Sequence, residues 1–298
     1  MLDLMRCEAT ADPNEFWDAT SDFLLSDPFR NSVTITNVVA RRTGAVTDPK
    51  PATYLIVRDS AGAVVGTAMR TPPHAVVLSP MPAAAVEAAV EALLPLCPDA
   101  AGVNATVAEA SAFASAWTRR SGGSTNVGMH LRIHRLDAVD PPAQVAGSMR
   151  VAGEADRDLL TAWTEAFTVE AEGGGPSSED TDQAAEANEE ARHNVDLRLA
   201  EHRAWIWDAA GPVSYAGTSV CVAGVVRIGP VYTPPAARGK GYASALVAAV
   251  SQAALDAGAV ACTLYTDVGN PTSNKIYAAV GYRPVCDVTS YRFQSDGS

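Results

Sequence analysis

The sequence predicts an α/β protein made of two halves, each with a mixed central sheet flanked by helices. Three observations lead to this prediction. Strand and helix patterns alternate along both halves, the segment from His134 to Arg150 has paired prolines and no periodicity, and the composition (47% hydrophobic, 19% charged) is typical of a globular chain. At 298 residues the chain can form two domains of ordinary size. We expect a first domain at 1–136, a linker at 137–147 and a second domain at 148–298.

Two helical patterns open the first half, and a hairpin that turns at Ser60-Ala61-Gly62 follows them. The remaining patterns alternate between strand and helix. In order, the predicted elements are helices at 16–25 and 32–40, strands at 53–59, 63–70 and 75–79, a helix at 82–94, a strand at 101–106, a helix around Phe113 and Trp117, and a strand at 129–136.

The second half has nearly the same order of elements. Asp156 can cap the first helix of this half, and Gly258 can end the helix that follows the strand at 225–232. The predicted elements are a strand at 148–152, helices at 159–167 and 181–202, strands at 204–208, 212–222 and 225–232, a helix at 241–258, a strand at 260–266, a helix at 273–281 and a strand at 282–293. Shared order without clear sequence identity indicates a duplication.

The composition narrows the function classes. A net charge of −12 argues against nucleic acid and anionic membrane as partners, because both require clustered Lys and Arg. The five cysteines are widely spaced, with no zinc or redox spacing, so we expect reduced thiols and no metal. The N-terminus lacks a signal-peptide pattern and no apolar run reaches membrane-spanning length, so we expect a cytoplasmic protein.

The stretch "GPVYTPPAARGKGYASALVAAV" concentrates glycine and positive charge in an acidic protein. A strand, a glycine-rich turn and a helix in succession form an anion site, because turn amides and the first amides of the helix converge there. The stretch is not a P-loop, since Gly241 follows Lys240 where Ser or Thr is required, and Pro234 replaces the first glycine. A dinucleotide-binding turn is also a poor match, because Ser244 occupies the third small position.

The segment from Arg238 to Ala243 reads Arg-x-x-Gly-x-Ala and resembles the pyrophosphate loop of the GCN5-related N-acetyltransferases (GNAT). A second family element follows, Asn-x-x-small-x-x-x-Tyr then Gly-Tyr, in "NPTSNKIYAAVGY". The resemblance covers roughly 149–293. The first half resembles the fold by element order only, because "TPPHAVVLSPMP" stands where the loop should be. The resemblance implies tandem GNAT-like domains, of which the first is a degenerate copy.

The resemblance also implies a cofactor, acetyl-CoA, and the residues that bind it. Backbone groups of the strand would align the pantetheine arm, the loop would hold the pyrophosphate, and Tyr277 matches the tyrosine that protonates the leaving thiolate. The implied cofactor-binding residues are Val231, Tyr232, Thr233, Arg238, Gly239, Lys240, Gly241, Tyr242, Ala243, Ser244 and Asn270.

The general base is less evident, because the strand at 225–232 contains no carboxylate. Asp267, just after a buried strand, is the first candidate. Glu170 and Glu172 at the end of the first helix are further candidates, and a water relay stays open. For each of these carboxylates a surface or capping role is the simpler interpretation.

Charge suggests the kind of acceptor. Between Gly153 and Asp208 there are 15 acidic residues against 4 arginines, a net charge of −11. Because this family places its first two helices at the acceptor entrance, a cationic small-molecule amine is one hypothesis, and a solvated acidic helix face is the other. We therefore expect an acetyl-CoA-dependent N-acetyltransferase. The alternative is a non-catalytic acyl-CoA-binding sensor or scaffold protein.

Overall fold

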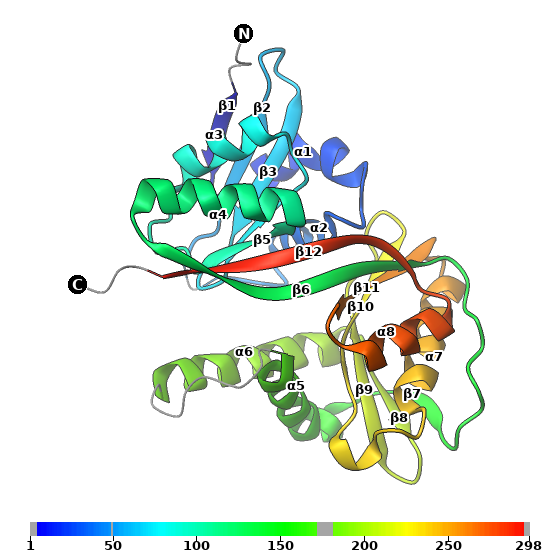
Figure 1. The fold of residues 1–298 in the computed structure, drawn as a ribbon. Coiled ribbons are helices and arrows are strands. Elements are labelled where there is room, and N and C mark those ends of the chain that lie inside the picture. The colour runs from blue at the N-terminus through cyan, green and yellow to red at the C-terminus, as the bar shows by residue number, and fades with distance from the viewer. Residues whose placement is uncertain (1–4, 49, 172–180, 295–298) are drawn as a thin grey trace. The chain divides into compact units, whose positions relative to one another are not determined.

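The computed structural model describes residues 5–48, 50–171 and 181–294, with the side chains of 181–187 left out. One of the residues considered above, Glu172, lies outside this description. The chain follows the order β-α-α-β-β-β-α-β-α-β twice (Figure 1). The predicted α/β class with two similar halves is therefore confirmed.

The first half contains β1 (Arg6–Thr10), α1 (Pro13–Leu25), α2 (Ser32–Arg42), β2 (Thr53–Arg58), β3 (Val64–Arg70), β4 (Val76–Leu78), α3 (Ala83–Leu93), β5 (Gly102–Thr106), α4 (Val107–Ser121) and β6 (Ser124–Leu136). The second half contains β7 (Ser148–Val151), α5 (Arg157–Ala171), α6 (Thr181–Ala200), β8 (Ala204–Asp208), β9 (Pro212–Thr218), β10 (Val225–Tyr232), α7 (Tyr242–Asp256), β11 (Ala261–Asp267), α8 (Pro271–Val280) and β12 (Arg283–Gln294).

Apart from shifted ends, such as the earlier start of β6 at Ser124, two details differ from the sequence-based expectation. Strand β1 was not predicted, because its five residues are mostly half-exposed and lack a buried alternating face. Strand β9 ends at Thr218 rather than at Val222, since Ala223 and Gly224 adopt positive φ and form a tight turn closed by Val222 and Val225. Both differences concern short stretches in which local geometry outweighs hydrophobic pattern.

The chain forms two compact units that are not continuous in sequence. Residues up to Ile133, together with Asp267–Gly269 and Val285–Ser298, form unit 1, and His134–Thr266 with Asn270–Pro284 form unit 2. The last strand, β12, thus belongs largely to unit 1, where Val288–Arg292 pairs antiparallel with Gly102–Thr106 of β5. The expected domains at 1–136 and 148–298, with a linker at 137–147, stay a prediction.

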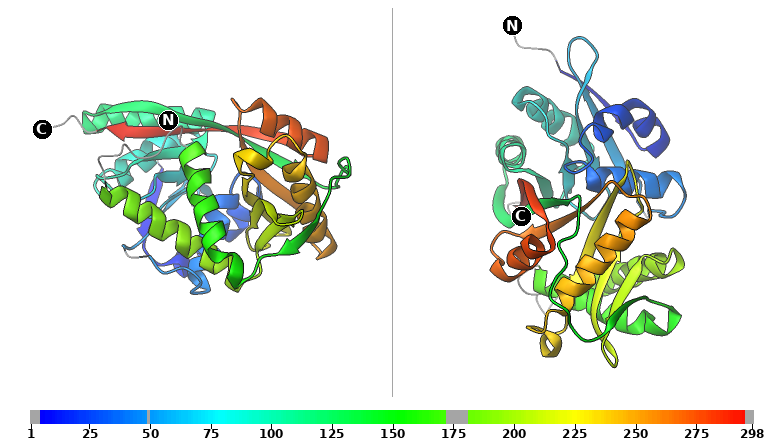
Figure 2. Two further views of the ribbon diagram at one scale, coloured as in Figure 1. Left: turned by 90° about the horizontal axis from the view of Figure 1, so that it is seen from below. Right: turned by 90° about the vertical axis from the view of Figure 1, so that its right-hand side faces the viewer.

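Unit 1 has a mixed sheet in the order β1-β2-β3-β4-β5-β12-β6. The pairs β1–β2, β2–β3 and β3–β4 are antiparallel, and β4–β5 is parallel. Side chains alternate across β2: Leu55 and Val57 join the core under α3 and α4, whereas Tyr54 faces the other way and stacks on Phe16 of α1 at 4.8 Å. Helices therefore cover both faces of this sheet (Figure 2).

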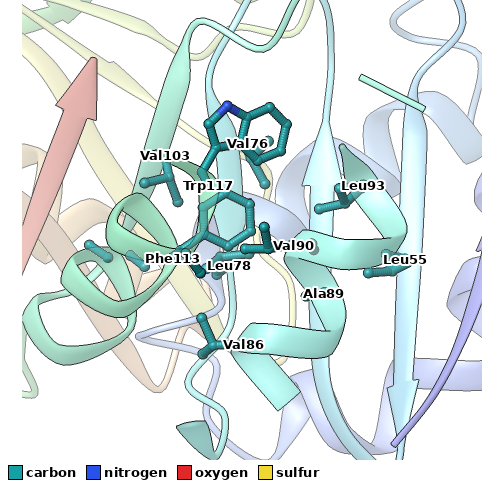
Figure 3. Close-up of a cluster of buried hydrophobic side chains, with 14 of the residues drawn as sticks. Leu55, Val76, Leu78, Val86, Ala89, Val90, Leu93, Val103, Phe113 and Trp117 are labelled. Atoms are coloured by element: carbon teal, nitrogen blue, oxygen red, sulfur yellow. The ribbon is translucent and has the colours of Figure 1, made fainter. Parts of the chain in front are cut away.

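The core of unit 1 lies between this sheet and α3 with α4 (Figure 3). The alanine- and valine-rich face of α3 lets the helix lie close to the strands. Phe113 and Trp117 of α4 stack at 5.6 Å, and both are almost fully buried. The predicted helix around these two aromatic residues is confirmed.

Unit 2 has a mixed sheet in the order β11-β10-β9-β8-β7. The strands from β7 to β10 are antiparallel, and β10–β11 is parallel. Alternation again separates two cores. Ala204 and Ile206 pack with α5 and α6, whereas Trp205 and Trp207 pack against the α7 side. The helices α5 and α6 thus cover one face, and α7 covers the other.

The segment 137–147 forms neither helix nor strand, as its prolines predict. It is nevertheless fixed along unit 2 beside α7 (Figure 2). The amide of Asp140 donates to the carbonyl of Val280 at 2.8 Å, and the indole of Trp207 donates to the carbonyl of Ala146 at 2.9 Å. This linker is therefore part of the surface of unit 2.

Two leucines three residues apart test the placement of the first core. Leu93 is 1% exposed inside the core of unit 1, and Leu96 is 51% exposed. We expect Leu93→Ala to lower the free energy of unfolding by about 2–5 kcal/mol, because it leaves a cavity. Leu96→Ala should change it by roughly 0.5 kcal/mol or less. Urea denaturation of both variants measures the difference, and equal losses would contradict this core.

Candidate active site

The site is built where β10 leaves its parallel neighbour. β10 pairs with β11 only over Val225–Arg227, opposite Ala261–Thr263. Its pairing with β9 continues to Tyr232, with a register shift between Ile228 and Val231. The register shift marks a bulge, which increases local twist and turns a strand away from its neighbour. The last residues of β10 are therefore paired on the β9 side and lie beyond the end of the β11 ladder.

Backbone groups after the bulge have defined partners on one side. Tyr232 pairs with Tyr215, and the Tyr232 carbonyl also accepts a hydrogen bond from the Ser214 hydroxyl at 3.2 Å. The hydroxyls of Ser214 and Thr233 lie 2.8 Å apart. Pairing with β9 thus fixes one edge of the segment 231–233. The backbone groups on its other edge therefore keep a constant direction.

The loop that follows β10 depends on two glycines. Gly239 and Gly241 have φ angles of +76° and +82°, a region that other residues adopt with strain. Between them Lys240 is exposed. A Cβ atom at Gly239 would meet nothing within 4 Å, so open space lies next to this turn. A turn in which left-handed residues alternate with right-handed ones can point its amides into a shared concavity.

The helix α7 begins at this concavity without a side-chain cap. Gly241 is its N-cap residue and offers no side chain, whereas α1 and α8 are capped by Asp12 and Asn270. The first turn of α7 contains Tyr242, Ala243 and Ser244. The first amides of a helix have no partner inside it, and the helix dipole favours negative charge at this end. This loop and helix terminus can hold an anion.

Arg238 is held on the strand side of the loop. Its Nε donates to the carbonyl of Thr233 at 2.8 Å, and its Nη2 donates to both carboxylate oxygens of Glu170 at 2.8 and 2.7 Å. The guanidinium lies 5.7 Å from the ring centre of Tyr232. Glu170 is in the last turn of α5, so an ion pair joins α5 to the glycine loop.

Tyr232 and Trp163 complete the surroundings of this ion pair. The Tyr232 hydroxyl donates to Glu170 at 3.5 Å, and the rings of Tyr232 and Trp163 are 6.2 Å apart. Burial raises the pKa of Tyr232, and the nearby Glu170 carboxylate raises it further. The Tyr232 phenol therefore stays neutral and can donate a hydrogen bond over the physiological pH range.

Tyr277 lies on α8 and packs against the α7-side core of unit 2. Its ring meets Tyr282 edge-on at 6.0 Å. Tyr277 is partly exposed as a residue, and burial raises the pKa of its phenol to about 12. The phenol is thus fully protonated near neutral pH.

Two other predicted site residues, Asn270 and Asp267, make hydrogen bonds within the local structure. The Asn270 side chain accepts the amide of Ser273 at 3.1 Å and caps α8, which also has Pro271 at its first position. Asp267 is exposed, and its carboxylate accepts the amide of Gly269 at 2.8 Å. Asp267 groups with unit 1, whereas the loop and Tyr277 lie in unit 2, so their cooperation stays a prediction.

Sequence reasoning overlooked two arginines on the α6 side of the sheet. A Cβ atom at Gly217 would lie 2.8 Å from Arg198 Nε and 3.0 Å from the Gly229 carbonyl, so the Arg198 side chain lies against the bulge of β10. Arg227 is in the strand itself, where burial and the charges of Arg198 and Arg203 lower its pKa. The signal was available, since Arg227 interrupts an otherwise apolar strand.

Unit 1 lacks the loop at the corresponding place. Between β4 and α3 the chain reads Ser-Pro-Met-Pro from Ser79 to Pro82. Pro80 and Pro82 have no amide hydrogen to offer, and Met81 is only 8% exposed and packs into the core. The predicted absence of a pyrophosphate loop in the first half therefore has a structural reason.

The described residues form no cluster of three or more His, Cys, Asp or Glu side chains arranged for a metal ion. In the same ranges, no helix is both long and apolar enough to cross a membrane.

Comparison with known proteins gives a family match in the second half and a fold match over the chain. Residues 160–282 match the model of the acetyltransferase (GNAT) family. Among solved structures, the chain is similar to a tandem GNAT protein from the clavulanic acid biosynthesis pathway (TM-score 0.56, 14% identity, 99% of both chains covered). It is similar also to a GCN5-related N-acetyltransferase from Sphaerobacter thermophilus (TM-score 0.56, 17% identity, 97% of this chain and 95% of that chain). No curated protein sequence matches. At these identities the structural matches show the fold.

Asn270 allows a test of its structural role. Asn270→Ala should lower the free energy of unfolding by about 1 kcal/mol, because it leaves the Ser273 amide without its cap. Asn270→Asp should cost only a few tenths of a kcal/mol, since Asp caps helices about as well as Asn. Urea denaturation compares the two. A loss of the same size in both variants would show that the side chain has a role besides capping.

Proposed function

Because the C-terminal half of the chain is a GNAT domain and the N-terminal half a second GNAT-like fold, we propose that the protein transfers an acetyl group from acetyl-CoA to an amine acceptor. One observation carries the proposal. The uncapped start of α7 follows the left-handed Gly239 and Gly241 directly, beside a strand that has left its parallel neighbour.

The residues present fit the cofactor. Its pyrophosphate is an anion, and the open turn at Gly239 with the first amides of α7 (Tyr242, Ala243, Ser244) suits an anion. Backbone groups of Val231, Tyr232 and Thr233 would align the pantetheine arm, and Arg238 and Lys240 would add positive charge. When bound, acetyl-CoA supplies the acetyl thioester.

Tyr277 is the proposed proton donor. Its phenol, with a pKa near 12, keeps its proton at any pH at which the protein works. A thiol such as that of a cysteine has an ordinary pKa of about 8.5, so full transfer from this phenol to a thiolate is uphill. The phenol therefore acts first as a hydrogen-bond donor that stabilises negative charge on sulfur, and the transfer of its proton follows.

The acceptor side is the less defined part of the proposal. Asp267 is kept as the candidate base. Exposed acidic side chains such as Glu189 and Glu190 on α6 support an amine acceptor that is a cationic small molecule. With a net charge of −12, nucleic acid and anionic membrane are not proposed as partners, and a cytoplasmic location stays a prediction.

A second function deserves a direct comparison, because unit 1 keeps the same element order without the glycine loop. This shows that a GNAT-like fold can persist without the site, and it supports a non-catalytic acyl-CoA-binding sensor or scaffold protein as the alternative. Thiol release from acetyl-CoA with pooled amines, measured beside the binding of CoA alone, separates the two. Binding without amine-dependent thiol release favours the sensor.

Gly239 provides a matched pair that tests the anion site. Asp and Asn have the same shape and both tolerate the left-handed conformation, so Gly239→Asp and Gly239→Asn differ mainly in charge. We expect Gly239→Asp to weaken CoA binding by about tenfold or more relative to Gly239→Asn, because two like charges would meet. Isothermal titration calorimetry at low salt measures both. Equal affinities would place the pyrophosphate elsewhere.

Tyr277→Phe tests the proton donor, since it keeps the ring and its packing. We expect kcat to fall by about 10²–10⁴-fold with little change in acetyl-CoA affinity, because the hydroxyl acts as the thiolate forms. With the pKa raised to about 12, the wild-type kcat should show no loss of this acid up to pH 10. Single-turnover transfer at acceptor saturation is the measurement. An unchanged single-turnover rate would make Tyr277 a packing residue.

A further inference from the structure

The guanidinium of Arg238 lies in surroundings that suit a cation. The Glu170 carboxylate accepts two hydrogen bonds from its Nη2 at 2.7 and 2.8 Å, and the face of Tyr232 lies 5.7 Å away. Trp163 is tilted against Tyr232. A carboxylate beside an aromatic face is the combination that binds ammonium and guanidinium groups. We call Glu170, Tyr232 and Trp163 the cation cage.

Arg238 has a different role in the proposed cofactor site. It is the first residue of the loop at the start of α7, and its Nε donates to the Thr233 carbonyl at 2.8 Å. Thr233 is one of the residues whose backbone groups we propose to align the pantetheine arm. In this arrangement Arg238 covers a group that the cofactor needs, and Glu170 holds it there. Cofactor and cage therefore compete for one side chain.

Arg238 can pair either with Glu170 or with the pyrophosphate of the cofactor. Arg238 and Glu170 are 45% and 47% exposed, and exposed ion pairs are weak because water and salt screen them. The pyrophosphate of acetyl-CoA carries two negative charges next to a helix N-terminus, so it can attract Arg238 away from Glu170. When Arg238 pairs with the pyrophosphate instead, the Glu170 carboxylate of the cation cage loses this partner.

We propose that the cation cage binds the ammonium group of the acceptor, and that Arg238 occupies the cage as an internal substitute until acetyl-CoA draws it away. The inference rests on the proposed function and adds to it a residue, Glu170, and a class of ligand, an alkylammonium ion. Acetyl-CoA then binds before the amine, because Arg238 occupies the cation cage until the cofactor has bound. Glu170 positions the amine close to the end of β10.

Calorimetry of CoA binding is the first test. In Glu170→Gln the carboxylate no longer holds Arg238, so CoA should bind about two- to fivefold more tightly than to wild type, a change typical of losing an exposed ion pair. The matched control is Glu91→Gln, an exposed position on α3 of unit 1, which should leave the affinity unchanged. Equal or weaker CoA binding by Glu170→Gln overturns the competition. No CoA binding by wild type would instead overturn the proposed function.

The second test uses n-butylammonium chloride as the probe and saturation-transfer NMR as the readout. Wild type should bind the probe several-fold more tightly with saturating CoA than without it. Arg238→Gln should bind the probe without CoA, because the cage is open, and Glu170→Gln should fail to bind it in either condition. If CoA leaves the probe affinity of wild type unchanged, or if Glu170→Gln still binds the probe, the proposed cation cage is wrong. The two variants change opposite halves of one ion pair, so misfolding cannot produce both expected results.

Discussion

The parting of β10 from β11 is the constraint on which the site depends. The parallel ladder stops at Arg227, and a bulge follows at once, while the antiparallel ladder to β9 continues to Tyr232. A strand paired on one side is still rigid, because β9 fixes its direction. The same strand can then present its other edge and lead directly into the glycine loop. Without the bulge, β11 would cover the edge that we propose for the cofactor.

The electrostatics of unit 2 are arranged around that strand end. The chain is strongly acidic, yet Arg238, Lys240, Arg198 and Arg227 all lie on or beside β10 and its loop. Positive charge at the loop would complement the proposed anionic cofactor, and the Glu170 carboxylate is paired with Arg238 there. An exposed ion pair can exchange its partners easily, whereas an ion pair buried in a core would keep them. The ion pair is thus suited to a ligand-dependent role.

The two halves show which parts of the fold are needed for folding and which for the site. Both have a sheet with helices on both faces and a core formed by alternating side chains. The loop after the fourth strand contributes little to either core, apart from Met81 in the first half. Prolines can therefore replace glycines there without cost to the core. This explains how one half can keep the architecture and lose the anion site.

The sequence by itself determined the class, nearly every element and the position of the glycine turn before α7. These follow from local physics: periodicity sets strand or helix, and glycine sets the left-handed turn at Gly239 and Gly241. Only the tertiary structure decided that β12 joins unit 1, that Asn270 is occupied in capping α8, and that Arg238 meets Glu170. Arg238 and Glu170 are 68 positions apart. No local pattern encodes such a contact, because it depends on how α5 packs over the end of β10.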